Sequence, residues 1–275
     1  MALRDYLSGM LAKRLAAFFD AAPAAALVTV AEAKGSTPRE AGAWMVVSPE
    51  KTFGTIGGGQ LEFLAIAKAR ELIAENIATG ALDIPLGPEI GQCCGGRVAL
   101  DIRIAGERER ADLLRRAESE DAARPHVYLF GGGHVGHALA AALALLPVRT
   151  VVVETRAEAL EGMPDAVETR LTAVPEEAVR SAPPGSAFVV LTHDHALDFL
   201  ITGEALARND AAYVGMIGSK TKKATFKNWY LKNGGEEARL ARLVTPIGGA
   251  DLRDKRPAVI AALTAAEVMR AVLQQ

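Results

Sequence analysis

The sequence contains only two cysteines, and they are adjacent: Cys93 and Cys94. Neighbouring Cα atoms lie about 3.8 Å apart across a trans peptide, below the roughly 4.4–6.8 Å that an unstrained disulfide prefers. The pair is therefore expected to be two free thiols, acting either as small buried apolar side chains or as reactive and metal-binding groups. Free thiols suit a reducing compartment, so a cytoplasmic location is expected.

The chain also lacks an excess of either charge. Its 31 Lys and Arg residues and 33 Asp and Glu residues give a net charge of -2 at pH 7. No overall basic field would hold nucleic acid or an anionic membrane, so the expected partner is a small molecule or another protein. The N-terminal region also lacks a long apolar run, so we expect no signal peptide and no membrane span there. Its apolar residues are interrupted by charged ones: Arg4, Asp5, Lys13, Arg14 and Asp20.

Half of the 275 residues are hydrophobic, enough for the packed core of one large or two ordinary domains. The stretch 106–125 is charged, favours a helix and is poor in β-branched residues, which predicts a surface helix and linker. The first domain is then 1–105 and the second 126–275. In the first domain we expect helices at about 4–20 and 60–78 and strands at 26–33, 43–48 and 97–104, with glycine-rich turns between them.

The second domain alternates short apolar runs with helical patterns. The runs VYLF, TVVVE, VE at 167–168, AFVVLT and AYVGM are each followed by a helix-favouring segment. Such alternation predicts a parallel sheet with helices on both faces. A proline opens a further amphipathic helix at 257–273. The predicted fold class is α/β, with an N-terminal mixed α+β domain followed by a Rossmann-like parallel-sheet domain.

A glycine pattern opens this second domain. Gly131, Gly133 and Gly136 form G-x-G-x-x-G between the strand VYLF and the next helix. Glycines let the backbone approach a phosphate, whose charge then meets unpaired N–H groups and the positive end of the helix. Glu154 ends the next strand, where it would accept hydrogen bonds from a ribose or similar diol. NAD is the default ligand, but His134 stands where many dehydrogenases have a small or apolar residue, which counts against NAD and not against a phosphate. The alternative is a tightly packed loop that binds nothing.

A histidine-rich stretch follows the strand AFVVLT, at the carboxyl edge of the sheet where ligands of open α/β folds bind. His193 and Asp194 are candidates for ligand contact or acid–base work, and helix capping is the alternative role for Asp194. A zinc set of His193, His195 and Asp198 is a further possibility. Against it, adjacent strand residues point to opposite faces and no thiolate is near in sequence.

The stretch GMIGSK follows the strand AYVGM. It lacks the GK[ST] ending of a Walker loop, so hydrolysis of nucleoside triphosphates is not expected. Lys220 or the helix start at Ser219 would hold an anion. A simple capping role for Ser219 is the alternative.

Three special stretches of the first domain occur in a fixed order before the Rossmann-like part: GSTPR at 35–39, GTIGGGQLE at 54–62 and the glycine-flanked cysteines. Together with THDHALD, YVGMIGSK and TPIGGADLRDKRPAVIAA, they resemble the XdhC/CoxI family over essentially the whole chain. Glu62 has a simpler alternative role, because a carboxylate stabilises the first turn of a helix.

The resemblance implies an accessory protein without turnover of its own. Such a protein binds the molybdenum cofactor, molybdopterin, as cargo. It shields the cofactor while a cysteine desulfurase supplies the terminal sulfur, and it delivers the cofactor to the apo-subunit of xanthine dehydrogenase. The resemblance also implies a homodimer. Two alternatives remain: an NAD(P)-dependent oxidoreductase using the Rossmann-like domain, and a thiol-redox or sulfur-carrying protein, which lacks the C-x-x-C spacing of such chemistry.

The chemistry of this cargo suits the residues above. Molybdopterin carries a phosphate, a flat polar pterin and a soft dithiolene-bound metal. The glycine loop is expected to cradle the phosphate, and Arg39 would add a guanidinium that pairs with oxyanions. A thiolate could approach the molybdenum. Cys94, directly before Gly95 and Gly96, matches the cysteine most widespread in the family pattern, and Cys93 is the extra thiol.

Overall fold

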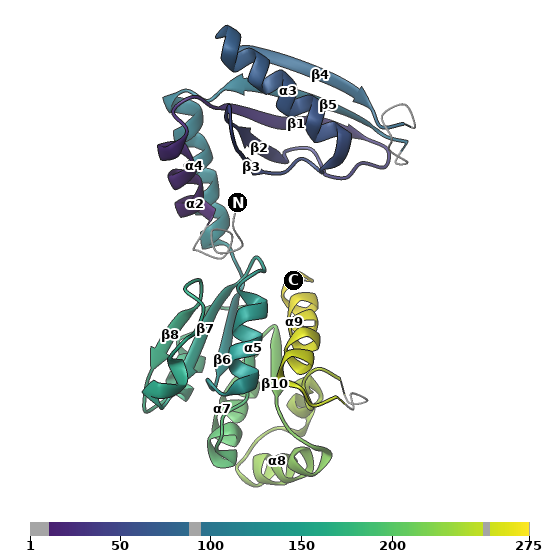
Figure 1. Cartoon of the computed structure of the whole chain (residues 1–275). Helices are drawn as coiled ribbons and strands as arrows, with labels where there is room; N and C mark the ends of the chain where they lie inside the picture. The colour runs from purple at the N-terminus through teal and green to yellow at the C-terminus, as the bar shows by residue number, and fades with distance from the viewer. Residues whose placement is uncertain (1–10, 88–94, 250–253, 275) are drawn as a thin grey trace. The chain divides into compact units, whose positions relative to one another are not determined.

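The computed structural model describes residues 11–87, 95–249 and 254–274 (Figure 1). These residues form two compact units, one within residues 10–122 and one within residues 123–275. Each unit has its own sheet and its own apolar core. Across the described ranges, no helix is both long and apolar enough to cross a lipid bilayer.

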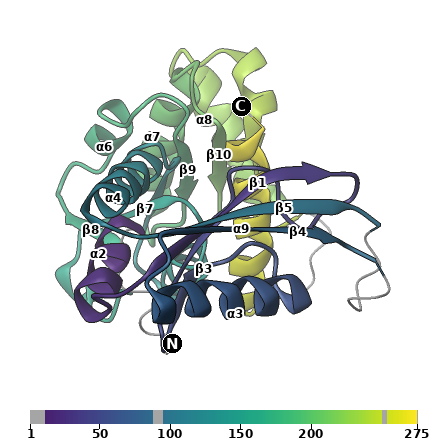
Figure 2. The same cartoon turned by 90° about the horizontal axis from the view of Figure 1, so that it is seen from above.

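The first unit is built on a five-stranded antiparallel sheet in the order β3-β2-β1-β5-β4. Its strands are β1 (Ala26–Lys34), β2 (Trp44–Val47), β3 (Thr52–Gly54), β4 (Thr79–Pro85) and β5 (Arg97–Ile104). Helix α3 (Gly59–Glu75) lies along one face of this sheet, as Figures 1 and 2 show. Leu61 and Leu72 of α3 share a buried core with Val28 and Leu100 of the sheet. The predicted mixed α+β domain is confirmed.

Two further helices of this unit pack on each other. They are α2 (Leu11–Ala21) and α4 (Glu107–Ala122). Leu15 of α2 and Leu113 of α4 are buried in one cluster with Phe53 of β3. The residues expected to form a linker helix, 106–125, therefore include a helix that contributes to the core of the first unit.

The second unit contains a six-stranded parallel sheet in the order β11-β10-β9-β6-β7-β8. Its strands are β6 (His126–Phe130), β7 (Arg149–Glu154), β8 (Glu168–Leu171), β9 (Ala187–Val190), β10 (Tyr213–Met216) and β11 (Leu243–Val244). Its helices are α5 (His134–Leu143), η2 (Ala157–Leu160), α6 (Glu176–Arg180), α7 (His195–Ala207), α8 (Lys220–Lys232), η3 (Glu237–Arg242) and α9 (Pro257–Leu273). Separate apolar clusters fill the two faces of the sheet. The predicted Rossmann-like domain is confirmed.

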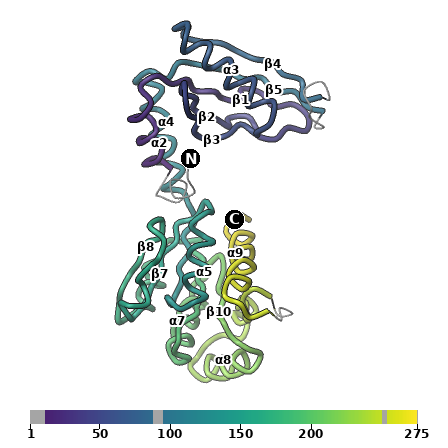
Figure 3. The backbone as a smooth tube through the Cα atoms, in the orientation of Figure 1, coloured from purple at the N-terminus to yellow at the C-terminus, as the bar shows by residue number. Residues whose placement is uncertain are grey.

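From β6 the chain adds β7 and β8 on one side of the sheet, and it then adds β9, β10 and β11 on the other side. The order of the strands therefore reverses between β6 and β9, which are parallel, hydrogen-bonded neighbours. The helices that follow these two strands are α5 and α7. Helix α5 packs against α9, and both contribute to the same apolar cluster on one face of the sheet (Figure 3). In open α/β sheets, ligands bind outside the carboxyl ends of the strands at this reversal point. The glycine loop after β6 and the histidine-rich stretch after β9 both begin there.

Three strands were not predicted. β3 and β11 have only three and two residues, too few for a sequence pattern to develop. β4, TGALDIP, contains glycine, aspartate and proline, which are poor strand formers. It forms because it pairs with β5 along its whole length at the edge of the sheet, where a proline is tolerated.

Candidate functional site

The glycines that follow the cysteines in sequence pack against the loop after β1. A Cβ atom at Gly96 would lie 2.3 Å from the carbonyl oxygen of Ser36, and one at Gly35 would lie 3.3 Å from the Cα of Gly96. Leu86 N donates to the Gly96 oxygen at 2.7 Å, and Gly95 N donates to the Leu86 oxygen at 2.8 Å. Only glycine permits this close backbone contact. The base of the segment that carries the cysteines is thereby fixed beside the GSTPR stretch.

The same stretch also contacts the second glycine-rich loop. Gly57 has a φ of +128°, and a Cβ atom there would lie 2.5 Å from Cγ of Pro38. Residues 35–39 therefore contact both residues 54–59 and the backbone at 95–96. Three stretches that are far apart in sequence lie together at one end of the first unit. Cys93 and Cys94 lie outside the described residues, so their roles stay predictions.

Glu62 holds the glycine-rich loop before α3. Its Oε1 accepts hydrogen bonds from the backbone N–H of Ile56 at 3.0 Å, Gly57 at 3.2 Å and Gly58 at 2.9 Å, and from the Thr55 hydroxyl. Burial opposes ionisation, but these hydrogen bonds outweigh it and lower the pKa of Glu62. Glu62 thus lies in the first turn of α3, as the alternative structural role predicted, but its hydrogen bonds hold the loop before the helix.

Replacing Glu62 with glutamine should lower the free energy of unfolding by about 1–2 kcal/mol at pH 7, because hydrogen bonds to a charged acceptor are lost. The pKa of Glu62 is lower in the folded than in the unfolded state, whose value is near 4.5. Its contribution is therefore complete above pH 4.5 and is lost as the pH falls through the folded value. Urea unfolding at pH 7 and at lower pH measures this. A Glu75→Gln control, at the exposed end of α3, should change the free energy of unfolding at pH 7 by no more than about 0.5 kcal/mol.

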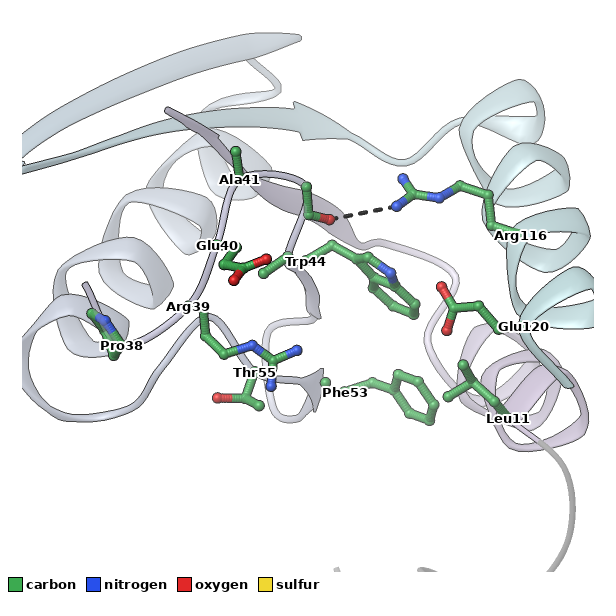
Figure 4. A pocket seen from close by; sticks show the side chains of 13 residues that line it. Leu11, Pro38, Arg39, Glu40, Ala41, Trp44, Phe53, Thr55, Arg116 and Glu120 are labelled. Atoms are coloured by element: carbon green, nitrogen blue, oxygen red, sulfur yellow. Dashed lines mark hydrogen bonds between the residues drawn. The ribbon is translucent and has the colours of Figure 1, made fainter. Parts of the chain in front are cut away.

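Arg39 lines a hollow of about 660 Å³ in the first unit (Figure 4). The rings of Trp44 and Phe53 stack at this hollow, with centroids 6.1 Å apart and an interplanar angle of 17°. Within the described residues, the exposed guanidinium of Arg39 makes no hydrogen bond or ion pair. Its position leaves it available to an oxyanion, which is the role the sequence predicted.

In the second unit, two of the three motif glycines are required by close packing. Gly131 has a φ of +124°, and a Cβ atom there would lie 2.4 Å from the carbonyl oxygen of Leu191. One at Gly136 would lie 2.1 Å from the oxygen of Gly131. Gly133 differs, since a Cβ atom there would meet no heavy atom within 4 Å. It precedes α5 without a side-chain cap, and His134 at the helix start is exposed. The loop thus keeps an open helix start that fits a phosphate.

Glu154 is already engaged by its own chain. Its side chain is buried, and its oxygens accept hydrogen bonds from Gly132 N at 2.9 Å, Thr155 N at 2.8 Å and the Arg156 guanidinium at 3.1 Å. Burial alone would raise the pKa of Glu154, but Arg156 and the backbone donors outweigh it and lower the pKa to about 2. A ribose diol would have to displace Arg156 to reach this carboxylate. Glu154 therefore has a structural role that competes with the predicted contact to a ligand.

The histidine-rich stretch and the GMIGSK stretch meet at the ends of β9 and β10. They line a hollow of about 300 Å³ that includes His193, His195 and Ser219. Asp194 caps α7 by accepting from Ala196 N at 2.7 Å. The Ser219 hydroxyl caps α8 by accepting from Lys222 N at 3.2 Å. Both capping roles that the sequence left open are present, and Lys220 is exposed in the first turn of α8.

Asp198 lies beneath this hollow with no exposed surface. It accepts hydrogen bonds from the Thr192 N–H at 3.0 Å and the Thr192 hydroxyl at 2.7 Å, and it is ion-paired with Lys222. The zinc set, against which the sequence already argued, is not formed: Asp198 is used by these partners, and no group of three His, Cys, Asp or Glu side chains in the described part of the chain is placed to hold a metal ion. Lys222 was not predicted from the sequence. An acid within the apolar helix ALDFLITG was the available signal that a buried cation must be nearby.

A doubly wound parallel sheet with a glycine loop at its reversal point, preceded by an antiparallel α+β unit, defines a two-domain protein with a Rossmann-type second domain. Comparison with known families gives two matches. Residues 127–268 match the XdhC Rossmann domain, and residues 20–83 match the XdhC and CoxI family. The chain belongs to the XdhC and CoxI family.

Two individual relatives extend this comparison. The uncharacterized protein YqeB of Escherichia coli is 25% identical over 254 residues, which cover 89% of this chain and 43% of YqeB. This chain therefore spans less than half the length of that relative. The crystal structure of a xanthine dehydrogenase from Bacillus halodurans superposes with a TM-score of 0.79 at 18% identity, covering 96% of each chain. At that identity the likeness shows a shared fold.

Proposed function

We propose that this protein is an accessory factor that binds the molybdenum cofactor, protects it during sulfuration and delivers it to an apo-subunit of xanthine dehydrogenase. The observation that carries the proposal is the meeting of residues 35–39, residues 54–59 and the base of the cysteine segment in a member of the XdhC and CoxI family. In the relatives named above, function is stated only for the Bacillus protein, described as a xanthine dehydrogenase. That this chain acts in the maturation of such an enzyme is what we propose here.

The donor groups of the chain suit this cargo. Molybdopterin presents a phosphate, which the open start of α5 beyond Gly133 would accept through backbone N–H groups. Arg39 supplies a guanidinium that is free among the described residues. Cys94, with Cys93 beside it, supplies the soft donor that a metal bound by sulfur would take. The residues thus provide an anion cradle, a fixed positive charge and thiolate chemistry.

The proposal includes the setting in which the protein works. Its partners would be a cysteine desulfurase, the dehydrogenase subunit and a second copy of this chain, within the cytoplasm. The protein itself would bind and transfer without catalysing a reaction. The direct test is gel filtration of the purified protein after mixing with molybdopterin, followed by activation of apo-xanthine dehydrogenase with the loaded fraction. A protein that elutes free of cofactor would refute the proposal.

An NAD(P)-dependent oxidoreductase is the second candidate, favoured by the open approach to Gly133. The engagement of Glu154 by Arg156 and Gly132 works against it, because no acceptor is left for the ribose. Thermal unfolding with NAD and with NADP decides between the two functions. We expect no significant stabilisation. A gain of about 2.7 kcal/mol at a hundredfold excess over the dissociation constant would favour the oxidoreductase.

A further inference from the structure

The hollow beside Arg39 has a composition that the proposed function leaves unexplained. It lies in the first unit, between the loop before β2, strand β3 and helix α4. Figure 4 shows the Trp44 ring pointing into it, the Phe53 ring below, Glu120 of α4 beside the indole and Arg39 on the opposite side. Its volume of about 660 Å³ lies within the usual range of small-molecule sites.

Three charged side chains around this hollow are not used by the fold. Within the described ranges, the side chains of Arg39, Glu40 and Glu120 make no hydrogen bond or ion pair, and all three residues are exposed. Arg116, one turn before Glu120 on α4, donates to the Gly42 oxygen at 3.5 Å and so ties α4 to the loop before β2. The hollow therefore offers the aromatic face of Trp44, an unpaired carboxylate beside it at Glu120, a second carboxylate at Glu40 and an unpaired guanidinium at Arg39.

A 2-amino-4-oxopteridine ring matches this set of groups. Its flat face stacks on an indole. Its amino edge presents two parallel N–H donors, the exocyclic amine and the neighbouring ring nitrogen, which a carboxylate accepts as it accepts the two parallel donors of a guanidinium. We propose that the hollow is the subsite for the pterin ring of the cargo, with Trp44 against the ring and Glu120 at its amino edge. Arg39 then faces the cargo's anionic groups. This inference rests on the proposed function.

The two tryptophans of the chain make the subsite measurable. Trp229 lies in the second unit, packed on Phe199 and Phe226, so Trp229→Phe leaves Trp44 as the sole indole reporter. This variant is titrated with 6-hydroxymethylpterin and with the matching lumazine, which carries an oxygen in place of the 2-amino group. Saturable quenching of Trp44 is expected, with the pterin binding at least about tenfold more tightly because the lumazine loses a charge-assisted hydrogen bond.

Adding Glu120→Gln should weaken pterin binding by about tenfold and remove the preference over lumazine. Glu118→Gln is the matched control, because Glu118 is exposed on the same helix and does not line the hollow. Equal binding of pterin and lumazine, or equal effects of the two substitutions, would overturn the subsite. Retention of whole molybdopterin is measured in parallel. Retention without any pterin preference leaves the accessory role and refutes only the subsite, whereas a pterin preference without retention supports the subsite and refutes the accessory role.

Discussion

Replacing Lys222 with methionine should lower the free energy of unfolding by about 3–5 kcal/mol. Lys222 is ion-paired with Asp198; their side chains are 10% and 0% exposed. Removal of the ammonium leaves the carboxylate of Asp198 buried, and the donors that remain to it among the described residues are the Thr192 N–H and hydroxyl. Breaking a buried pair in this way costs more than the pair itself contributes, because the remaining charge stays desolvated. Urea unfolding followed by circular dichroism measures the loss.

Lys223→Met is the matched control, since Lys223 is exposed one position further along α8. Its effect should stay within about 0.5 kcal/mol. The double replacement Asp198→Leu with Lys222→Met should recover much of the loss, because two apolar side chains then fill the space of the pair. A Lys222→Met protein as stable as the Lys223→Met control would show that the pair has no structural role. If Lys222→Met does not fold, the double replacement is compared with the Lys223→Met control, and a folded double variant shows that the unpaired charge of Asp198 prevented folding.

Substitutions at two glycines of the loop after β6 should separate the effect on protein stability from the effect on ligand binding. Gly136→Ala is expected to cost about 1–3 kcal/mol or more, because its methyl group would lie 2.1 Å from the Gly131 oxygen and force the backbone to move. Gly133→Ala should leave the thermal melt nearly unchanged, since its φ is -76° and no heavy atom lies within 4 Å of the added Cβ. That methyl group occupies the space through which a phosphate would approach.

Molybdopterin retention after gel filtration is therefore expected to fall for Gly133→Ala although the protein stays folded. The thermal melts and the retained cofactor per protein are measured on the same samples. Two outcomes would contradict this account of the loop. One is full retention by Gly133→Ala, which would remove the start of α5 from the cofactor site. The other is a Gly136→Ala protein that melts like the wild type.

The second unit was predictable because its signals are local. Short buried strands rich in valine alternate with helices, and the junctions that follow β6, β9 and β10 carry glycine, serine or aspartate. The same local chemistry predicted the alternative capping roles of Asp194 and Ser219, which the structure confirms. The first unit was harder, because β4 depends on pairing with β5 rather than on its own residues.

The interactions that could not be predicted join residues through tertiary packing. Asp198 and Lys222 are 24 positions apart and meet only because α7 and α8 lie side by side in the folded unit. Trp44 and Glu120 are 76 positions apart and line one hollow because α4 returns to the loop before β2. The pairing of Glu154 could have been predicted from the sequence, since Arg156 stands two positions later. An arginine so near an acid at a strand end was a signal that the acid is already paired.

The central claim is that this chain holds molybdopterin with the help of a thiol from the cysteine pair. The most direct measurement is the amount of molybdopterin retained per protein after gel filtration by wild type, Cys94→Ala and Cys93→Ala. We expect Cys94→Ala to lose most of the cofactor with an unchanged thermal melt, and Cys93→Ala to retain more. Retention by Cys94→Ala equal to that of wild type would contradict the claim.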